Sequence, residues 1–223
     1  MKTLVIAPHP DDELLGCGGT MLRRVAEGAS VGWVVVTGMH SLPGVTPQKI
    51  EYRQREIERV RGGLGLDPDN VFHLGLPTTK LDTVGISVLV EELSSVFKKF
   101  QPQEVLAPYF GDVHSDHRIA FDAVVACTKW FRYPSVRRVL VYETLSETDS
   151  IIDPASVFRP NVFVDISTFI DQKVRLMEVY KSELGPFPFP RSEVAIRALA
   201  QVRGAQSGFL AAESFMLLRE RLV

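Results

Sequence analysis

The sequence has little cysteine, no long apolar run and no excess of either charge. Its two cysteines, Cys17 and Cys127, are too few for a disulfide framework and lack any CxxC spacing, so we expect reduced, buried thiols. Lys and Arg number 25 against 27 Asp and Glu, which gives a net charge of −2 and argues against a nucleic-acid or anionic-membrane partner. No run of about 18 apolar residues occurs, and the chain opens directly on a strand pattern without a signal peptide. These absences indicate a cytoplasmic globular protein.

The order of apolar segments predicts the fold class. The 223 residues, 45% of them hydrophobic, suit one α/β domain with a proper core. Strands are expected at 3–7, 31–37, 70–73, 104–107 and 138–143, and helices at 12–27, 47–64, 84–100 and 117–131. This alternation predicts a Rossmann-like, doubly wound, mostly parallel sheet with helices on both faces.

The alternation loosens after residue 145. We expect an edge strand at 162–165 and helices at 169–180 and 191–203, separated by the proline-rich segment 185–190. Residues 1–145 are therefore interpreted as a catalytic core that carries both candidate motifs described below. Residues 146–223 are interpreted as an extension of the same domain that walls the pocket or forms a homo-oligomer contact.

One imidazole and three carboxylates lie within five residues, from His9 to Glu13, directly after the first predicted strand. Open α/β sheets place their ligand sites at the carboxyl ends of strands. His9 and Asp12 are three residues apart across a strand-to-helix turn, so both can converge on one ion, and this pair suits zinc or another borderline divalent ion. Asp11 then stands beside the metal, where a general base takes a proton from water. Helix capping alone is the competing interpretation, but it needs one carboxylate and leaves His9 without a role.

A second cluster follows the predicted strand 104–107 and contains His114, Asp116 and His117. His117 opens the next helix and is expected to be the third protein ligand, the number that a catalytic zinc site takes. His114 would then be free to stabilise an oxyanion or to protonate a leaving amine, and Asp116 to orient His114. A surface loop with a capping aspartate and two incidental histidines is the alternative.

The two clusters together resemble the signature of the PIG-L/LmbE-like metal-dependent N-deacetylases. The residues that carry the resemblance are His9-Pro10-Asp11-Asp12-Glu13, Gly18-Gly19-Thr20 and His114-x-Asp116-His117. Weaker matches are Leu74-Gly75-Leu76-Pro77, Lys173, Arg203-Gly204 and Ala212-Glu213-Ser214-Phe215, so the resemblance extends through most of the chain. Many relatives carry an acidic residue just after the Leu-Gly-Leu-Pro stretch, where this chain has Thr78-Thr79.

The resemblance implies a reaction and a set of roles. Such enzymes hydrolyse acetamido groups, typically on small molecules, lipids or glycans that contain N-acetylglucosamine. It implies Zn²⁺, or another divalent metal, bound by His9, Asp12 and His117. It also implies Asp11 as the general base, His114 as the residue that stabilises the oxyanion, and Asp116 as the residue that orients His114.

Three further residues are expected to contact the substrate, an N-acetylated sugar or glycoconjugate. Arg53 lies in the charged helix 47–64, where relatives use an arginine; a solvated charge is the alternative. Tyr142 and Glu143 end a strand on the predicted active face and are expected to line the pocket, with strand-edge packing as the alternative.

Zinc-dependent deacetylation of an N-acetylglucosamine-type substrate is the leading hypothesis, and two alternatives remain. Magnesium-dependent phosphoryl transfer would use the acidic pair, but it leaves His9 and His117 idle, and the chain has no P-loop. A non-catalytic sugar-binding relative would retain the fold without turnover. The glycines at 16, 18 and 19 fall inside a predicted helix, so close packing explains them better than a dinucleotide fingerprint.

Overall fold

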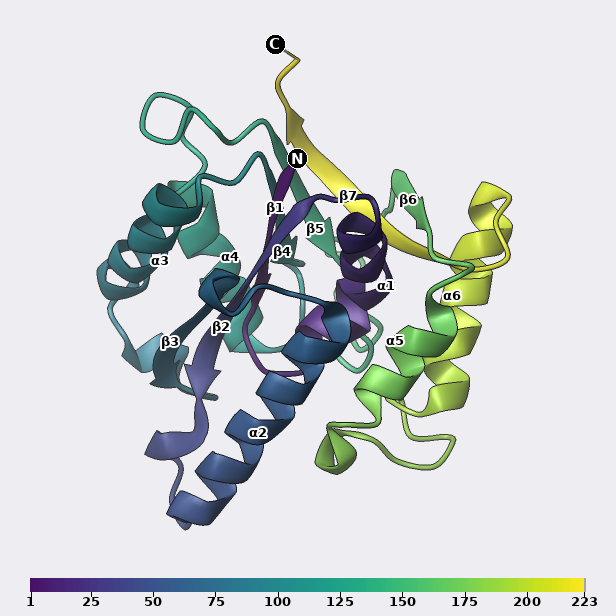
Figure 1. The fold of residues 1–223 in the computed structure, drawn as a ribbon, viewed down its shortest axis with the longest axis horizontal. Coiled ribbons are helices and arrows are strands. Elements are labelled where there is room, and N and C mark those ends of the chain that lie inside the picture. Colours follow the sequence, from purple (N-terminus) through teal and green to yellow (C-terminus); the bar gives the residue numbers. More distant parts are fainter. Residues whose placement is uncertain (223) are drawn as a thin grey trace.

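A seven-stranded sheet forms the centre of the molecule in the computed structural model, which describes residues 1–222 (Figure 1). Its strands follow the order β3-β2-β1-β4-β5-β7-β6. They are β1 (Lys2–Ala7), β2 (Ser30–Gly38), β3 (Val71–Pro77), β4 (Glu104–Pro108), β5 (Arg138–Tyr142), β6 (Val162–Asp165) and β7 (Ala212–Glu220). Strands β1 to β5 pair in parallel, whereas β7 runs antiparallel to both β5 and β6. The predicted mostly parallel sheet is confirmed.

Helices cover both faces of the sheet because its central strands are apolar on both sides. In β1, Val5 and Ala7 face one core and Leu4 and Ile6 face the other, and all four are 0% exposed. The first core lies under α1 (Asp12–Ala26), α2 (Pro47–Leu64), α5 (Ile170–Met177) and α6 (Glu193–Ser207). The second lies under α3 (Ile86–Phe100) and α4 (Ser115–Ala126), as Figure 1 shows on its left side. This is the predicted doubly wound arrangement in a single domain.

Short 3₁₀ turns occupy Met39–Ser41, Pro68–Asn70, Leu81–Thr83 and Lys181–Glu183. Within residues 1–222, no helix combines the length and the apolar character that crossing a membrane requires.

The strand order reverses between β1 and β4, and this reversal positions the candidate site. β1 pairs with β2 on one side and with β4 on the other, so the segments that follow β1 and β4 leave the sheet in opposite directions. Such a switch point opens a crevice at the carboxyl ends of the strands, where α/β proteins bind their ligands. His9 follows β1, and His114 follows β4.

Helix α1 is broken in its middle. Cys17 has φ −147° and ψ 19°, which are not helical angles. A Cβ on Gly16 would lie 2.1 Å from Cδ2 of Tyr142, and one on Gly19 would lie 2.7 Å from Cγ2 of Ile166. Only glycine fits at such distances. The interpretation of these glycines as a close-packing device is therefore confirmed.

The predicted elements are all present, but several boundaries differ. Helix α4 is shorter than the predicted 117–131: it begins at Ser115, because the His114 side chain caps it, and ends at Ala126. Strand β3 continues through residues 75–77, which the sequence pattern assigns to a loop, and pairs with β2 across a register shift. Strand β7 is absent from the predicted elements, because five of its nine residues are partly or fully exposed and do not alternate with the buried ones.

Candidate metal centre and active site

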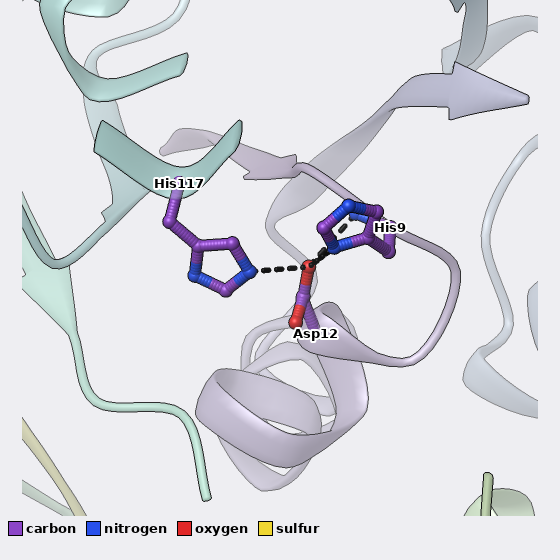
Figure 2. Close-up of side chains that lie close together, drawn as sticks. All are labelled: His9, Asp12 and His117. Carbon is purple, nitrogen blue, oxygen red and sulfur yellow. Dashed lines mark hydrogen bonds and ion pairs between the residues drawn. The ribbon is translucent and has the colours of Figure 1, made fainter. Parts of the chain in front are cut away.

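The three predicted metal ligands converge at the switch point (Figure 2). His9 comes from the end of β1, Asp12 from the first residue of α1, and His117 from the first turn of α4. Oδ2 of Asp12 lies 3.2 Å from Nδ1 of His9 and 3.2 Å from Nε2 of His117. One ligand atom from each residue can be chosen so that all three lie within 4.8 Å of one another.

This donor set fits a divalent ion such as zinc. Ligand atoms around a tetrahedral zinc with bonds of 2.0–2.1 Å are about 3.4 Å apart, close to the observed separations. Nε2 of His117 is buried and makes no hydrogen bond within the described chain, although it faces Asp12. Burial lowers the pKa of His117, but the carboxylates of Asp12 and Asp112 more than reverse this and raise it to about 10. The site therefore stabilises positive charge where a metal cation would lie.

Asp112 fixes the orientation of His117, a role that no motif in the sequence indicated. Oδ2 of Asp112 lies 2.8 Å from Nδ1 of His117, and its Oδ1 accepts a hydrogen bond of 2.6 Å from the Thr148 hydroxyl. Asp112 and His117 are both 0% exposed. The carboxylate holds the Nδ1–H tautomer and leaves Nε2 free for a metal. Its place in the same loop, five residues before His117, was the only signal in the sequence.

Asp11 stands beside Asp12, as expected for a general base. Its φ of 141° is unusual for a residue with a side chain, and Glu13 supports it by accepting the Asp11 N–H over 3.0 Å. Nη1 of Arg191 donates to Oδ2 of Asp11 over 2.9 Å. Burial and the neighbouring Asp12 raise the pKa of Asp11 to about 7 despite this arginine. Arg191 is 180 residues away in the sequence, so no local pattern pointed to it.

Asp116 lies in the site, but the prediction that its carboxylate orients His114 is wrong. Oδ2 of Asp116 lies 3.0 Å from Nε2 of His9, and the carboxylate also accepts the backbone N–H groups of Thr79 and Leu81, over 2.7 and 3.1 Å. It therefore holds His9, a predicted metal ligand, and the loop after β3. His114 is fixed instead through Nδ1, which accepts the Asp116 N–H over 3.1 Å.

The His114 ring lies beside the rings of His9 and His117, two of the predicted metal ligands. Its ring centroid lies 4.5 Å from that of His9 and 5.5 Å from that of His117. Burial, followed by the neighbouring His9 and His117, lowers the pKa of His114. Since Nδ1 accepts a hydrogen bond, the neutral ring carries its proton on Nε2 and has a donor to offer there.

A cavity of about 720 Å³ opens above these residues, a volume that suits a small organic ligand. At one end, called here the motif end, its lining includes His9, Asp11, Asp12 and His114. The segment after residue 145 contributes Ser146, Glu147, Glu183 and Arg191 to the wall. Away from the motif end, apolar residues of α2 and of strands β2 and β3 line the cavity: Ile57, Val35 and Val71.

Of the three predicted substrate contacts, Arg53 alone lines this cavity. Its guanidinium is held by carboxylates: Nη2 pairs with Glu183 and donates to the Ser182 hydroxyl over 3.1 Å, and Nη1 lies 3.3 Å from Oε2 of Glu56. Arg53 thus links α2 to the turn at Lys181–Glu183 across the cavity wall.

Tyr142 and Glu143 do not line the cavity, so that prediction is wrong for both. Tyr142 is 0% exposed, and its hydroxyl donates to the carbonyl of Ile6 over 2.7 Å. Glu143 accepts two hydrogen bonds from the Arg203 guanidinium and one of 2.6 Å from the Ser214 hydroxyl. Tyr142 thus links β5 to β1, and Glu143 links the end of β5 to α6 and β7. Strand-edge packing was the alternative that the sequence left open. Thr144, the next residue, does reach the cavity.

Comparisons with known proteins agree with this geometry. The model of the family described as PIG-L: GlcNAc-PI de-N-acetylase matches residues 4–128. Diacetylchitobiose deacetylase from Thermococcus kodakarensis is 28% identical over 228 residues, covering 95% of this chain and 81% of its own. The crystal structure of the conserved protein TT1542 from Thermus thermophilus superposes with a TM-score of 0.80 at 31% identity, covering 99% of this chain and 96% of that one.

The same fold also occurs in a protein described by another activity. GalB, the 4-carboxy-2-hydroxymuconate hydratase from Pseudomonas putida KT2440, superposes with a TM-score of 0.76 at 18% identity, covering 100% of this chain and 98% of its own. The fold alone therefore does not determine the reaction, and the side chains at the switch point must carry the argument.

Proposed function

Because the chain belongs to the PIG-L family, whose description is GlcNAc-PI de-N-acetylase, we propose that it is a metal-dependent deacetylase of N-acetylated sugars. The reaction adds water to an acetamide and releases acetate and a free amine. The observation that carries the proposal is the convergence of His9, Asp12 and His117 on one point, at the end of a cavity that Asp11 and His114 also line.

His9, Asp12 and His117 would hold the metal, for which zinc is the ion that the donor set favours. When bound, zinc supplies a Lewis acid that polarises the acetamide carbonyl and makes a nearby water easier to deprotonate. Asp112 and Asp116 keep the two histidine rings in place through hydrogen bonds of 2.8 and 3.0 Å.

Asp11 would be the general base. Its pKa of about 7, raised by burial and by Asp12, makes the carboxylate a proton acceptor near neutral pH. It takes the proton of the attacking water and can return it to the amine nitrogen as the C–N bond breaks. Arg191, 2.9 Å from Oδ2, fixes the carboxylate that does so.

His114 would stabilise the negative charge that develops on the carbonyl oxygen. With Nδ1 occupied by the Asp116 N–H, its Nε2–H is the available donor. A preorganised donor of this kind typically contributes about 10²- to 10³-fold to the rate. Magnesium-dependent phosphoryl transfer has less support, because two of the three converging donors are imidazoles and magnesium prefers oxygen.

Acetate release tests the proposal directly. We expect zinc-loaded protein to release acetate from at least one of four substrate classes: free N-acetyl sugars, nucleotide sugars, thiol glycosides and lipid-linked sugars. A protein that binds zinc stoichiometrically, yet releases acetate from none of them, would favour the non-catalytic sugar-binding alternative. Phosphate release dependent on magnesium would favour phosphoryl transfer.

A further inference from the structure

A buried ion pair from distant parts of the chain occupies the break in α1. In a continuous helix, the N–H of Gly19 would donate to the carbonyl of Leu15. Here Gly19 donates to Oε1 of Glu213 over 2.8 Å, and the Leu15 carbonyl accepts from Nζ of Lys173 over 2.9 Å. Nζ of Lys173 and Oε1 of Glu213 are 2.7 Å apart. The ion pair thus takes the place of one backbone hydrogen bond.

Both charged groups are fully engaged at this break. Oε2 of Glu213 accepts the N–H of Thr20 over 2.7 Å, so the carboxylate caps the second half of α1, where the helix dipole favours negative charge. The side chains of Lys173 and Glu213 are 5% and 4% exposed. Lys173 comes from α5 and Glu213 from β7, so two elements of the C-terminal part of the chain meet at one point of an N-terminal helix.

The contacts continue from the ion pair to the metal centre. The N–H of Leu15, whose carbonyl accepts from Lys173, donates to the carbonyl of Asp11 over 2.9 Å. Asp12 is the first residue of this same half-helix. Lys173 is therefore connected to Asp11 and Asp12 through a single turn of this half-helix.

We propose that Lys173 and Glu213 are positioning residues for the metal centre. They hold the first half of α1 at the angle at which Asp12 meets the two histidine ligands. This inference rests on the metal-dependent function proposed above. An ion pair that served stability alone would change unfolding and leave metal affinity untouched, whereas this pair acts on both.

The test compares zinc affinity with stability in Lys173→Met, Glu213→Gln and the double variant. Zinc affinity is measured by competition with a chromophoric chelator, and stability by thermal unfolding of the metal-free protein. Each single variant leaves one buried charge uncompensated and is expected to unfold at lower temperature, whereas the double variant removes both charges and recovers much of that loss. The double variant is nevertheless expected to bind zinc about tenfold more weakly than the wild type, as loss of a supporting group typically does.

Two further variants separate position from stability. Glu213→Asp keeps the charge but withdraws the carboxylate by one methylene, and it is expected to weaken zinc binding even if the double variant does not fold. Glu104→Gln is the matched control, because Glu104 is 1% exposed and paired with Arg24 and Arg138, but lies at the amino end of β4, whereas the candidate metal ligands follow the carboxyl ends of the strands. It is expected to lower the unfolding temperature without changing zinc affinity.

The outcomes distinguish this inference from the function on which it rests. Wild-type zinc affinity in both Glu213→Asp and the double variant would overturn the positioning role while leaving the deacetylase proposal intact. A wild-type protein that binds no zinc would overturn both.

Discussion

Asp112 and His117 form a buried hydrogen-bonded pair, with Oδ2 of the carboxylate 2.8 Å from Nδ1 of the ring. We expect Asp112→Asn to weaken zinc affinity by about 10- to 100-fold, because the amide no longer fixes the tautomer or the basicity of His117. Chelator competition measures this. Thr148→Val, which removes the hydrogen bond to the other carboxylate oxygen, should have a smaller effect in the same direction. Unchanged affinity in Asp112→Asn would contradict the role assigned to this carboxylate.

Asp11→Asn separates catalysis from metal binding. Asparagine tolerates the positive φ of 141° at this position better than alanine does, so the turn is expected to keep its shape. We expect kcat to fall by about 10²- to 10⁴-fold, the usual contribution of a general base, with stoichiometric zinc retained. Acetate release and metal analysis provide the two readouts. Asp67→Asn, in the exposed turn before β3, is the control and should retain full activity; substantial activity in Asp11→Asn would refute the assignment of the base.

Gly16→Ala tests the close packing at the broken helix. A Cβ at this position would lie 2.1 Å from the Tyr142 ring, so overpacking is expected to lower the free energy of unfolding by about 1–3 kcal/mol. The matched control is Gly62→Ala in α2, where a Cβ would meet no atom within 4 Å. There the substitution should raise the stability by about 0.5–1 kcal/mol, because alanine favours the helix. Denaturant unfolding of both variants measures the difference in sign, and a neutral Gly16→Ala would show that the contact is not restrictive.

Tyr142→Phe tests the correction of the predicted substrate contact. The variant loses the 2.7 Å hydrogen bond to the Ile6 carbonyl, which is expected to cost about 0.5–1.5 kcal/mol of unfolding free energy. KM for an N-acetyl sugar should stay at its wild-type value, since the hydroxyl points into the core. Arg53→Lys is the comparison, because Arg53 does line the cavity and its loss is expected to raise KM. A raised KM in Tyr142→Phe would restore the original prediction.

The sheet and the convergence of His9, Asp12 and His117 could be predicted, because each depends on a short sequence pattern. The composition of Lys2–Ala7, short and rich in β-branched residues, predicts a buried strand. The carboxyl ends of parallel strands lie on the same side of the sheet. His9, Asp12 and His117 therefore converge for reasons already present in the strand order. The position of His114 follows from the same strand order, but its contact with Asp116 uses the backbone N–H and not the predicted carboxylate.

The contacts that were missed or mistaken depend on tertiary packing. Arg191 reaches Asp11 across 180 residues, and no period or spacing encodes such a contact. The Asp116 carboxylate contacts His9, and the loop after β3 lies over it and donates the backbone N–H groups of Thr79 and Leu81. Glu143 lies one residue and Tyr142 two residues before Thr144 in the cavity wall, a difference that strand patterning does not resolve.

The insertion of β7 between β5 and β6 has a consequence for the order in which the protein is assembled. During synthesis, β5 and β6 are complete long before residues 212–220 emerge, and until then each presents an unpaired edge where β7 will later lie. Strand β7 also carries Glu213, whose carboxylate caps the second half of the broken helix α1. The candidate motif from His9 to Glu13, the first to leave the ribosome, is therefore followed by a helix that receives its Glu213 contact only late in synthesis. A shortened chain that lacks β7 would lack the carboxylate that caps the second half of α1.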